Sequence, residues 1–340
     1  MDDETSGKYR LLREVGRGSY GVVYEAAAGG TTARVAVKRT RCTEPETVEM
    51  ALQELWSLRS VRGQHRNVIR MEECLLQSGR GPGSVEPVCQ RRVTERHLRL
   101  VESCLKGRRR ACAEDKEEEA ASLYFITEYC DGGNLNDFLL GQAPEPRLHR
   151  ACMRQLAAAV SFLHRSQIVH RDLKPENVLV SHGPAGPELK VADFGLSKVC
   201  LGNVNVNQHR FSSACGSDFY MAPEVFEGRY TAKADIFSLG ILFWAMIEMV
   251  TFRDAETNKE LIGIYICQGK NLISVGEALL DNPNFELHMP IKQKKPMPRE
   301  VCALLLDMLA LNLKERLDAF EMEKRVKQLC YGEKRQGSGA

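Results

Sequence analysis

The stretch His170-Arg171-Asp172-Leu173-Lys174-Pro175-Glu176-Asn177, near the middle of the 340-residue chain, indicates the fold of the whole sequence. It is a polar run between the apolar residues 160–169 and 178–180, which is typical of a loop held between buried elements. The run contains a carboxylate, an ammonium group and a carboxamide, at Asp172, Lys174 and Asn177. The loop therefore brings three different polar groups to one place in the fold.

These three groups match the needs of one reaction type. A carboxylate can accept the proton of a hydroxyl group, an ammonium group can neutralise phosphate charge, and a carboxamide oxygen can bind a hard cation. In phosphoryl transfer the protein mainly positions the reactants and stabilises charge, so the loop favours that chemistry. On these residues alone, a charged loop with no catalytic role is an equally valid interpretation.

The composition is that of a globular chain and argues against several classes of protein. With 340 residues the chain has room for two domains or one large bilobed unit. Its 47 basic and 45 acidic residues nearly cancel, so the net charge gives no reason to expect nucleic acid or an anionic membrane as a partner. The 12 cysteines are scattered without a Cys-x-x-Cys pair, which favours reduced thiols over disulfides or a structural zinc site.

The first residues of the chain do not have the composition expected of a targeting signal. Residues 1–7 are acidic and polar, unlike a signal or transit peptide, and no apolar run is long enough to span a membrane. We expect the protein in the nucleus, the cytoplasm or both, with short tails at 1–8 and 331–340.

Residues 9–39 alternate apolar and polar side chains between glycines, which predicts three antiparallel strands. The first turn carries Gly16, Gly18 and Gly21, where backbone amides can approach phosphate oxygens. The glycine spacing alone is a weak signal, since dinucleotide-binding folds share it and a glycine-rich hairpin can be purely structural. A strand follows the glycines directly, where a dinucleotide fold would begin a helix. This favours a phosphate-covering hairpin, with Lys38 on the third strand near the same phosphates.

Residues 46–62 have apolar side chains at helical spacing. Glu54, in the middle of this helix, is the expected partner of Lys38, and Glu49 is the competing candidate. Glu54 is preferred because Leu55 and Leu58 place its surroundings on the inward side of the helix.

A strand at 67–76 precedes a long charged interruption at 77–121. We interpret the interruption as a solvated insertion, although its basic cluster at 106–110 could serve as a nuclear import signal or a docking patch. An apolar strand at 123–130 follows and ends in glycines. That transition predicts a hinge at 128–133 between two lobes.

Helices dominate the sequence after the hinge. Apolar periodicity predicts helices at 147–166, 234–250, 298–310 and 319–330. The helix at 234–250 is almost continuously apolar, so we expect it to be buried on all sides. Two short strands follow the opening loop and lead to Asp193, a second carboxylate, and then to a loop rich in Asn and Ser.

With these segments in order, residues 9–330 resemble a eukaryotic protein kinase. The resemblance rests on the segments 16–23, 35–38, 170–177, 193–195 and 222–224. It implies an α+β, bilobed fold. The small lobe, at 9–127, would hold an antiparallel sheet and one main helix, and the larger lobe, at 134–330, would be mostly helical.

The resemblance implies a serine/threonine kinase. Asp172 would orient the substrate hydroxyl and accept its proton, Lys174 would stabilise the transferred phosphate, and Ser217 would help to position the hydroxyl. The sequence Lys174-Pro175-Glu176 and the serine after Gly216 are both of the serine/threonine form.

The resemblance also implies ATP and Mg²⁺ as cofactors. Lys38, paired with Glu54, would contact the ATP phosphates, while Asn177 and Asp193 would bind the metal. The residues expected around the nucleotide are Val15, Gly16, Arg17, Gly18, Ser19, Tyr20, Gly21, Val22, Val23, Ala36, Lys38, Thr127, Glu128, Cys130 and Leu179. Thr127 is small for the position that guards the pocket behind adenine, which predicts access for bulky ATP-competitive inhibitors.

Further roles implied by the resemblance are regulatory or structural. A phosphate on Ser212 or Ser213 would pair with Arg171 and order the loop that carries these serines. Glu224 would pair with Arg316 in the base of the large lobe, and Asp235 would anchor the backbone of the opening loop.

Within the kinases, residues 13–26, 190–200 and 230–237 look like the subfamily of serine/threonine kinase thirty-five and the PDLIM-interacting-kinase-like proteins. The insertion and residues 275–280 fit as well. This finer resemblance implies a nuclear or nucleocytoplasmic protein that contacts actin-associated LIM proteins.

The sequence is compatible with three functions. The favoured one is an active kinase that phosphorylates protein serine or threonine and is activated by phosphorylation of its own loop. The second is a pseudokinase scaffold that binds nucleotide and protein partners, which the long insertion suggests but the presence of all the catalytic residues disfavours. The third is a kinase of metabolites or antibiotics, disfavoured because the chain contains a peptide-docking segment at 212–224.

Overall fold

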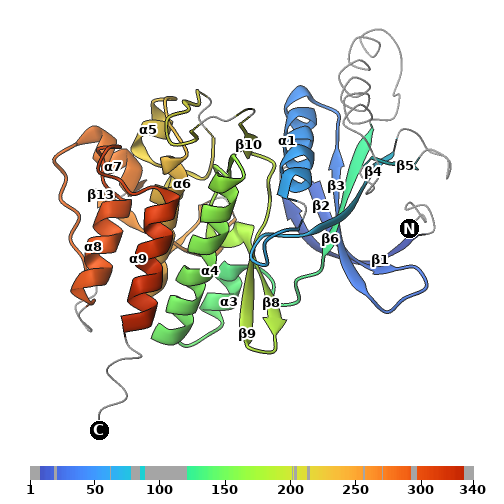
Figure 1. The fold of residues 1–340 in the computed structure, drawn as a ribbon, viewed down its shortest axis with the longest axis horizontal. Helices are drawn as coiled ribbons and strands as arrows, with labels where there is room; N and C mark the ends of the chain where they lie inside the picture. The colour runs from blue at the N-terminus through green and yellow to red at the C-terminus, as the bar shows by residue number, and fades with distance from the viewer. Residues whose placement is uncertain are drawn as a thin grey trace. The chain divides into compact units, whose positions relative to one another are not determined.

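The computed structural model describes residues 8–18, 21–61, 63–77, 85–88, 121–200, 202, 205–212, 215–255, 257–269, 271–291 and 297–332 (Figure 1). Contacts within the chain divide it into two units. The first comprises residues 1–64, 69–131 and 193–195, and the second comprises 65–68, 132–192 and 196–340. The short segment at 65–68 thus leaves the predicted small lobe, and the segment at 193–195 leaves the predicted large one.

The first unit contains an antiparallel sheet whose strands lie in the order β1-β2-β3-β6-β4-β5. The strands are β1 (Tyr9–Gly18), β2 (Gly21–Ala28), β3 (Arg34–Arg41), β4 (Met71–Gln77), β5 (Val85–Pro87) and β6 (Ser122–Glu128). The predicted three-strand start of the chain is present. Its alternation buries Val35 and Val37 of β3 against Ala26 and Ile126.

Among the described residues of the first unit, one helix accompanies this sheet, α1 (Pro45–Val61). It buries Val48, Leu52, Leu55 and Leu58 at the predicted helical spacing. Glu54 lies on the same inward face and is 5% exposed, whereas Glu49 is exposed. The structure thus decides between the two glutamates in favour of Glu54.

The strand predicted at 67–76 begins only at Met71. Its first residues are part of the second unit, where Asn67 donates a hydrogen bond to the carbonyl of Leu189 (2.8 Å) and Val68 forms a bridge to Val191. These long-range contacts draw the segment away from the sheet. The strand predicted at 123–130 likewise ends at Glu128.

The predicted insertion at 77–121 is only partly described. Within it β5 (Val85–Pro87) pairs with β4 and extends the sheet. The basic cluster at 106–110 lies outside the described residues, as does nearly all of the rest of the insertion.

The second unit is mainly helical. Its helices are α3 (Leu135–Leu140), α4 (Pro146–Arg165), α5 (Pro223–Phe226), α6 (Lys233–Glu248), α7 (Val275–Asp281), α8 (Arg299–Met308) and α9 (Ala319–Gly332). The four predicted helices correspond to α4, α6, α8 and α9, and α6 is buried from Ala234 to Met246 as expected. Helices α4 and α9 lie side by side (Figure 1). In the part of the chain that the structure describes, no helix is long and apolar enough to cross a membrane.

Short strands connect these helices. Two antiparallel pairs flank the loop at 170–177, namely β7 (Ile168–Val169) with β10 (Lys198–Val199) and β8 (Val178–Gly183) with β9 (Gly186–Val191). Two further hairpins follow α6, namely β11 (Thr251–Arg253) with β12 (Glu260–Ile262) and β13 (Tyr265–Gln268) with β14 (Asn271–Ser274). Neither of these hairpins nor the short helix α3 is predicted by the sequence patterns.

The expected ion pair between Glu224 and Arg316 forms in the second unit. The Arg316 guanidinium donates to both carboxylate oxygens of Glu224, at 2.5 and 3.0 Å, and its Nε donates to the carbonyl of Ala310 (2.8 Å). It also lies over the ring of Phe237, with 5.1 Å to the centroid. Arg316 is 1% exposed, so these partners replace the water that would otherwise stabilise its guanidinium.

Replacing Arg316 with alanine is expected to lower the free energy of unfolding by about 3–5 kcal/mol, because it leaves the Glu224 carboxylate buried without its cation. Denaturant unfolding would measure the loss. The control is Arg325→Ala, because Arg325 pairs with the half-exposed Asp307 and should contribute about 1 kcal/mol at most. Equal losses in the two variants would show that burial does not increase the contribution of the Arg316–Glu224 pair to the free energy of unfolding.

Candidate active site

The loop at 170–177 is held by a buried carboxylate on α6. The two oxygens of Asp235 accept hydrogen bonds from the backbone amides of His170 (2.9 Å) and Arg171 (2.8 Å). Nε2 of His164 lies 2.8 Å from the same carboxylate. Arg171 has a φ of 69°, a left-handed conformation that costs energy outside glycine. Asp235 thus anchors the loop backbone as predicted and stabilises its strained turn.

The surroundings of Asp235 set its charge. Burial raises the pKa of this carboxyl, but the hydrogen bond from His164, the nearby histidines and the Arg171 amide outweigh burial, so its pKa is lower than usual. A carboxyl with a lowered folded-state pKa contributes stability above its unfolded pKa, about 3.9, and loses that contribution as the pH falls through the folded value.

Asp235→Asn is therefore expected to reduce the free energy of unfolding by about 1–3 kcal/mol at pH 7, because one backbone amide of the loop loses its acceptor. The gap between wild type and variant should stay constant from pH 7 to 5 and narrow below about pH 4, since only the wild type titrates there. Urea unfolding at a series of pH values measures the gap. A gap that does not change down to pH 3 contradicts the assigned charge.

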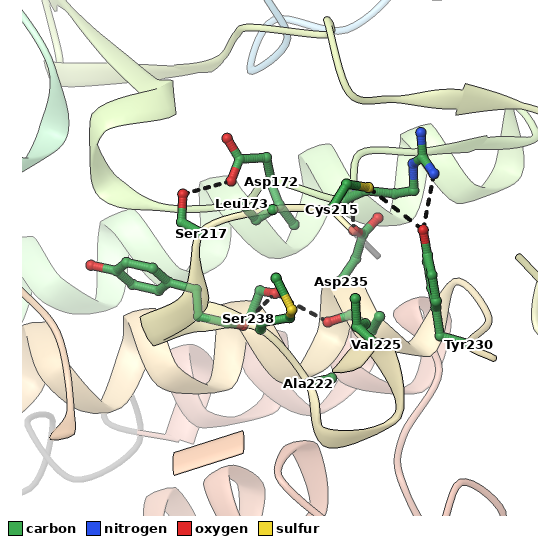
Figure 2. A pocket seen from close by; sticks show the side chains of 14 residues that line it. Asp172, Leu173, Cys215, Ser217, Ala222, Val225, Tyr230, Asp235 and Ser238 are labelled. Carbon is green, nitrogen blue, oxygen red and sulfur yellow. Dashed lines mark hydrogen bonds between the residues drawn. The ribbon is translucent and has the colours of Figure 1, made fainter. Parts of the chain in front are cut away.

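The structure brings Asp172, Lys174, Asn177 and Ser217 together, as Figure 2 shows for Asp172 and Ser217. One oxygen of Asp172 accepts a hydrogen bond from the Ser217 hydroxyl (2.8 Å), and the other accepts one from Nδ2 of Asn177 (2.8 Å). Nζ of Lys174 lies 2.5 Å from the Ser217 oxygen and 3.2 Å from the Asp172 carboxylate. A carboxylate that already holds one hydroxyl can hold and deprotonate another, and the ammonium group beside it can neutralise an anion.

A second cluster lies in the first unit. Nζ of Lys38, on β3, is 2.8 and 3.0 Å from the two oxygens of Glu54 and 3.0 Å from Asp193. Burial lowers the pKa of Lys38, but the two carboxylates outweigh it and the pKa is raised above its usual value. Lys38 therefore stays protonated and held in place, as a cation that contacts phosphate must be.

The residues expected to bind a metal ion offer oxygen atoms. Asp193 has a φ of 58° and a side chain that is 40% exposed. Among the described residues the Asn177 side chain bonds through Nδ2, to the carbonyl and carboxylate of Asp172, which leaves its carboxamide oxygen available to a hard cation. In the described ranges, no group of three or more His, Cys, Asp or Glu side chains forms a metal centre of its own.

Two glycines of the first turn in the first unit, Gly21 and Gly18, have different surroundings. A Cβ on Gly21 would lie 2.4 Å from the carbonyl of Arg39, so close packing of β2 on β3 requires glycine there. A Cβ on Gly18 would meet no described atom within 4 Å, so that backbone is open to a ligand. The tip residues Ser19 and Tyr20 lie outside the described residues.

The other residues expected around a nucleotide are divided between the two units. Ala36 pairs with Thr127 across β3 and β6, and both are half-buried. Glu128 donates its amide to the carbonyl of Arg70 (3.0 Å). The remaining described members of the first unit are Val15, Gly16, Arg17, Val22, Val23 and Cys130, and Leu179 lies on β8 of the second unit.

Arg171, the expected phosphate partner, has protein partners. Its Nε donates to the carbonyl of Leu196 (2.6 Å) and its Nη1 donates to the hydroxyl of Tyr230 (2.9 Å). Ser212 is exposed, and Ser213 lies outside the described residues. No local pattern predicts the role of Tyr230, because its hydrogen bond to Arg171 joins residues far apart in the chain.

A pocket lies beneath the loop, between it and α6 (Figure 2). Asp172 and Ser217 lie at one end of it, and Tyr230 and Cys215 at the other, with the Cys215 sulfur 3.6 Å from the Tyr230 hydroxyl. Asp235 and Ser238 of α6 line the side opposite the loop.

Comparisons with known proteins agree with this geometry. A family model described as "Protein kinase domain" matches residues 9–326. The chain is 25% identical to calcium-dependent protein kinase 5 of Plasmodium falciparum (isolate 3D7) over 326 residues, 95% of this chain and 46% of that protein. It is 38% identical to CDPK-related kinase 3 of Arabidopsis thaliana over 152 residues (41% of this chain, 24% of that protein) and 33% identical to human serine/threonine-protein kinase ULK1 over 214 residues (60% and 18%). The chain thus spans less than half the length of each of these relatives.

Because the family match covers nearly the whole chain and includes both clusters, this chain belongs to the protein kinase domain family.

Proposed function

We propose that this chain is an active serine/threonine protein kinase, which transfers the γ-phosphate of ATP to a protein hydroxyl. The observation that carries the proposal is the contact between the Asp172 carboxylate and the Ser217 hydroxyl, with Lys174 within hydrogen-bond distance of both. An acceptor hydroxyl that takes the place of Ser217 on Asp172 would be oriented for attack and could pass its proton to the carboxylate. Lys174 would neutralise charge on the phosphate.

The family implies ATP and a divalent cation, and the residues present fit both. The open backbone at Gly18 leaves room for phosphate oxygens, and Lys38 is kept charged by Glu54 and Asp193. Asp193 and Asn177 would hold the cation through oxygen, which suits Mg²⁺. When bound, the cation offsets charge on the phosphates.

A pseudokinase scaffold is the less favoured alternative. Such a protein has usually lost a lysine or carboxylate that binds the phosphates and metal, or the catalytic aspartate. Lys38, Asp172, Asn177 and Asp193 are all present here, and Lys38 and Asp172 are held by specific partners.

Loop phosphorylation is proposed as a regulator. Arg171 is already oriented by Leu196 and Tyr230, so a phosphate on Ser212 or Ser213 would add to an existing arrangement. Phosphopeptide mapping of the active enzyme tests this proposal, and an active enzyme with both serines unmodified contradicts it.

The finer expectations from resemblance remain proposals. They are membership in the subfamily of serine/threonine kinase thirty-five and the PDLIM-interacting-kinase-like proteins, contacts with actin-associated LIM proteins, and a nuclear or cytoplasmic location. Localisation of the tagged chain in cells, and co-precipitation with LIM proteins, would test them.

Incubation of the purified chain with ATP, Mg²⁺ and an array of serine and threonine peptides tests the function. Phosphate incorporation that depends on Asp172 supports a kinase. Nucleotide binding without turnover, in wild type and Asp172→Asn alike, supports the scaffold instead.

A further inference from the structure

Helix α4 carries a row of arginines on its exposed face. After its first residue, Pro146, the exposed residues of this helix are Arg147, Arg154 and Arg165, and the helix contains no Asp or Glu. Their separations of 7 and 11 residues are close to two and three helical turns, so the three side chains lie along one line. With about 1.5 Å of rise per residue, this arginine row is roughly 27 Å long.

The stability of the helix does not explain the arginine row. Arg147 lies in the first turn, where the positive end of the helix dipole disfavours cations. The half-buried Arg150 lies three residues after Arg147 and four before Arg154, and like charges at these spacings destabilise a helix. Among the residues that the structure describes, neither Arg147 nor Arg154 has a carboxylate partner. Both charges are therefore available to a binding partner.

The C-terminal end of the row adds an aromatic surface. The Arg165 guanidinium lies over the ring of Phe320, on α9, at 5.4 Å from the centroid. Phe320 is 40% exposed. Arg165 also lies 3.7 Å from the Glu323 carboxylate, yet its own side chain remains 62% exposed. A ligand at this end therefore meets an aromatic ring, a cation and a carboxylate together.

A further exposed cation, Arg66, lies in a segment that runs beside α4. The ring of His65 stacks on that of Phe162 of α4, with 5.0 Å between the centroids. The side-chain amide of Asn67 donates to the side-chain oxygen of Gln155 of the same helix (2.7 Å). Arg66 lies between these two anchors, and its side chain is 74% exposed, with Nε 3.2 Å from a carboxylate of β9. It extends the basic surface toward β9, which also contacts α4 (Figure 1).

We infer that the arginine row is a docking surface for an acidic segment of a partner protein, with an apolar side chain of that segment packed on Phe320. The basis is charge complementarity, because guanidinium groups bind carboxylates through paired hydrogen bonds. The arginines are about 10 and 16 Å apart along the helix, so a small anion such as phosphate would contact one at a time. An extended segment rises about 3.3 Å per residue, so about eight residues span the row.

Nucleic acid fits this surface less well than an acidic protein segment. Its phosphates repeat the same charge, whereas a carboxylate borders Arg165 and another borders Arg66. A protein segment can place a neutral or apolar residue opposite each carboxylate. The whole chain, with 47 basic and 45 acidic residues, also lacks the excess positive charge that is typical of nucleic-acid-binding domains.

Fluorescence anisotropy of a labelled peptide, with the full chain and without ATP, measures docking directly. The probe is a fluorescein-labelled peptide of about twelve residues, rich in Glu with one Phe near an end, which is long enough to span the row. Labelled single-stranded DNA of the same length is the second probe. The wild type is expected to bind the peptide more tightly than the DNA. Its affinity for the peptide should fall about tenfold from about 50 to about 300 mM NaCl, because salt screens exposed charges.

The double variant Arg147→Glu with Arg154→Glu should weaken peptide binding by about tenfold or more, since it reverses two charges of the row. Glutamate near the N-terminus of a helix is favourable, so the variant should keep the unfolding temperature of the wild type. Phe320→Ala should weaken binding of the Phe-containing peptide but not of the same peptide with Ala in its place. Equal effects on the two peptides would overturn the contact with Phe320.

Arg299→Glu is the matched control, because Arg299 is an exposed arginine in the first turn of α8, in the same unit but outside the row. It should leave the peptide affinity within about twofold of the wild type. Equal weakening in Arg299→Glu and the double variant, or no peptide binding by the wild type, overturns the inference. DNA binding that is tighter than peptide binding and lost in the double variant overturns it in favour of nucleic acid. The kinase proposal is tested separately, since none of these measurements uses ATP.

Discussion

Asp172→Asn is expected to lower kcat for peptide phosphorylation about 10³-fold, within the range for loss of a general base. One carboxylate oxygen of Asp172 accepts a hydrogen bond from the Ser217 hydroxyl, and the other accepts one from the Asn177 side-chain amide. These bonds fix the position of the carboxylate before substrate binds. Asparagine has nearly the same shape but cannot take up a proton. The variant should therefore retain the fold and lose the chemistry. Steady-state kinetics with the best peptide of an array gives the measurement.

The loss must be assigned to chemistry and not to folding. Asp281→Asn serves as control, because Asp281 is an exposed carboxylate at the end of α7 in the same unit and should keep wild-type kcat. ATP affinity and the unfolding temperature should be similar in Asp172→Asn and wild type. If Asp172→Asn retained more than about a tenth of the wild-type kcat, Asp172 would not be the base.

Lys38→Met is expected to reduce kcat/KM for ATP about 10²–10³-fold, comparable to removing one charged stabiliser of a transition state. Lys38 is 17% exposed at its side chain, and both of its partners are carboxylates. Methionine keeps the length and packing of the side chain but removes the cation that would contact phosphate. The Glu54 and Asp193 carboxylates would then face each other without a cation, which further disfavours an anionic ligand.

Two comparisons sharpen this prediction. Lys8→Met also breaks a lysine–glutamate pair in the first unit, with Glu73 at 2.6 Å. Because Lys8 is 57% exposed, this variant should keep the wild-type kcat/KM for ATP. Glu54→Gln should lose less activity than Lys38→Met, because it removes the partner that orients Lys38 and leaves the cation in place. Should Lys8→Met and Lys38→Met lose the same activity, the loss would reflect general damage to the sheet.

Local sequence patterns were sufficient to predict most of the helices and strands. The alternation at 9–39 gave three strands, and helical spacing gave α1, α4, α6, α8 and α9 to within a few residues. Such patterns succeed because each buried face belongs to one element and its period is visible within that element. The strand expected from residue 67 was too long because Asn67 and Val68 bond to β9 within the second unit, and the local sequence period does not show this contact.

The hairpins at 251–274 were missed for a related reason. Their strands have three or four residues each, too few to show a period, and side chains outside the hairpins hold them. Asn136 fixes β12 from more than a hundred residues earlier in the sequence, and Phe219 packs on β11. Short elements of this kind depend on tertiary contacts for their stability.

The sequence by itself determined the chemistry of the site. The order of residues at 16–21, 38, 172–177 and 193 supplied the glycines, the cation, the proposed base and the proposed metal ligands, because these functions need particular side chains at particular points of the chain. Only the tertiary structure decided which partners hold them. It gave Glu54 rather than Glu49 to Lys38, Ser217 to Asp172 and Tyr230 to Arg171. Each of these contacts joins residues that are distant in the sequence and become neighbours only when the fold buries them together, so their energy cannot be read from local spacing.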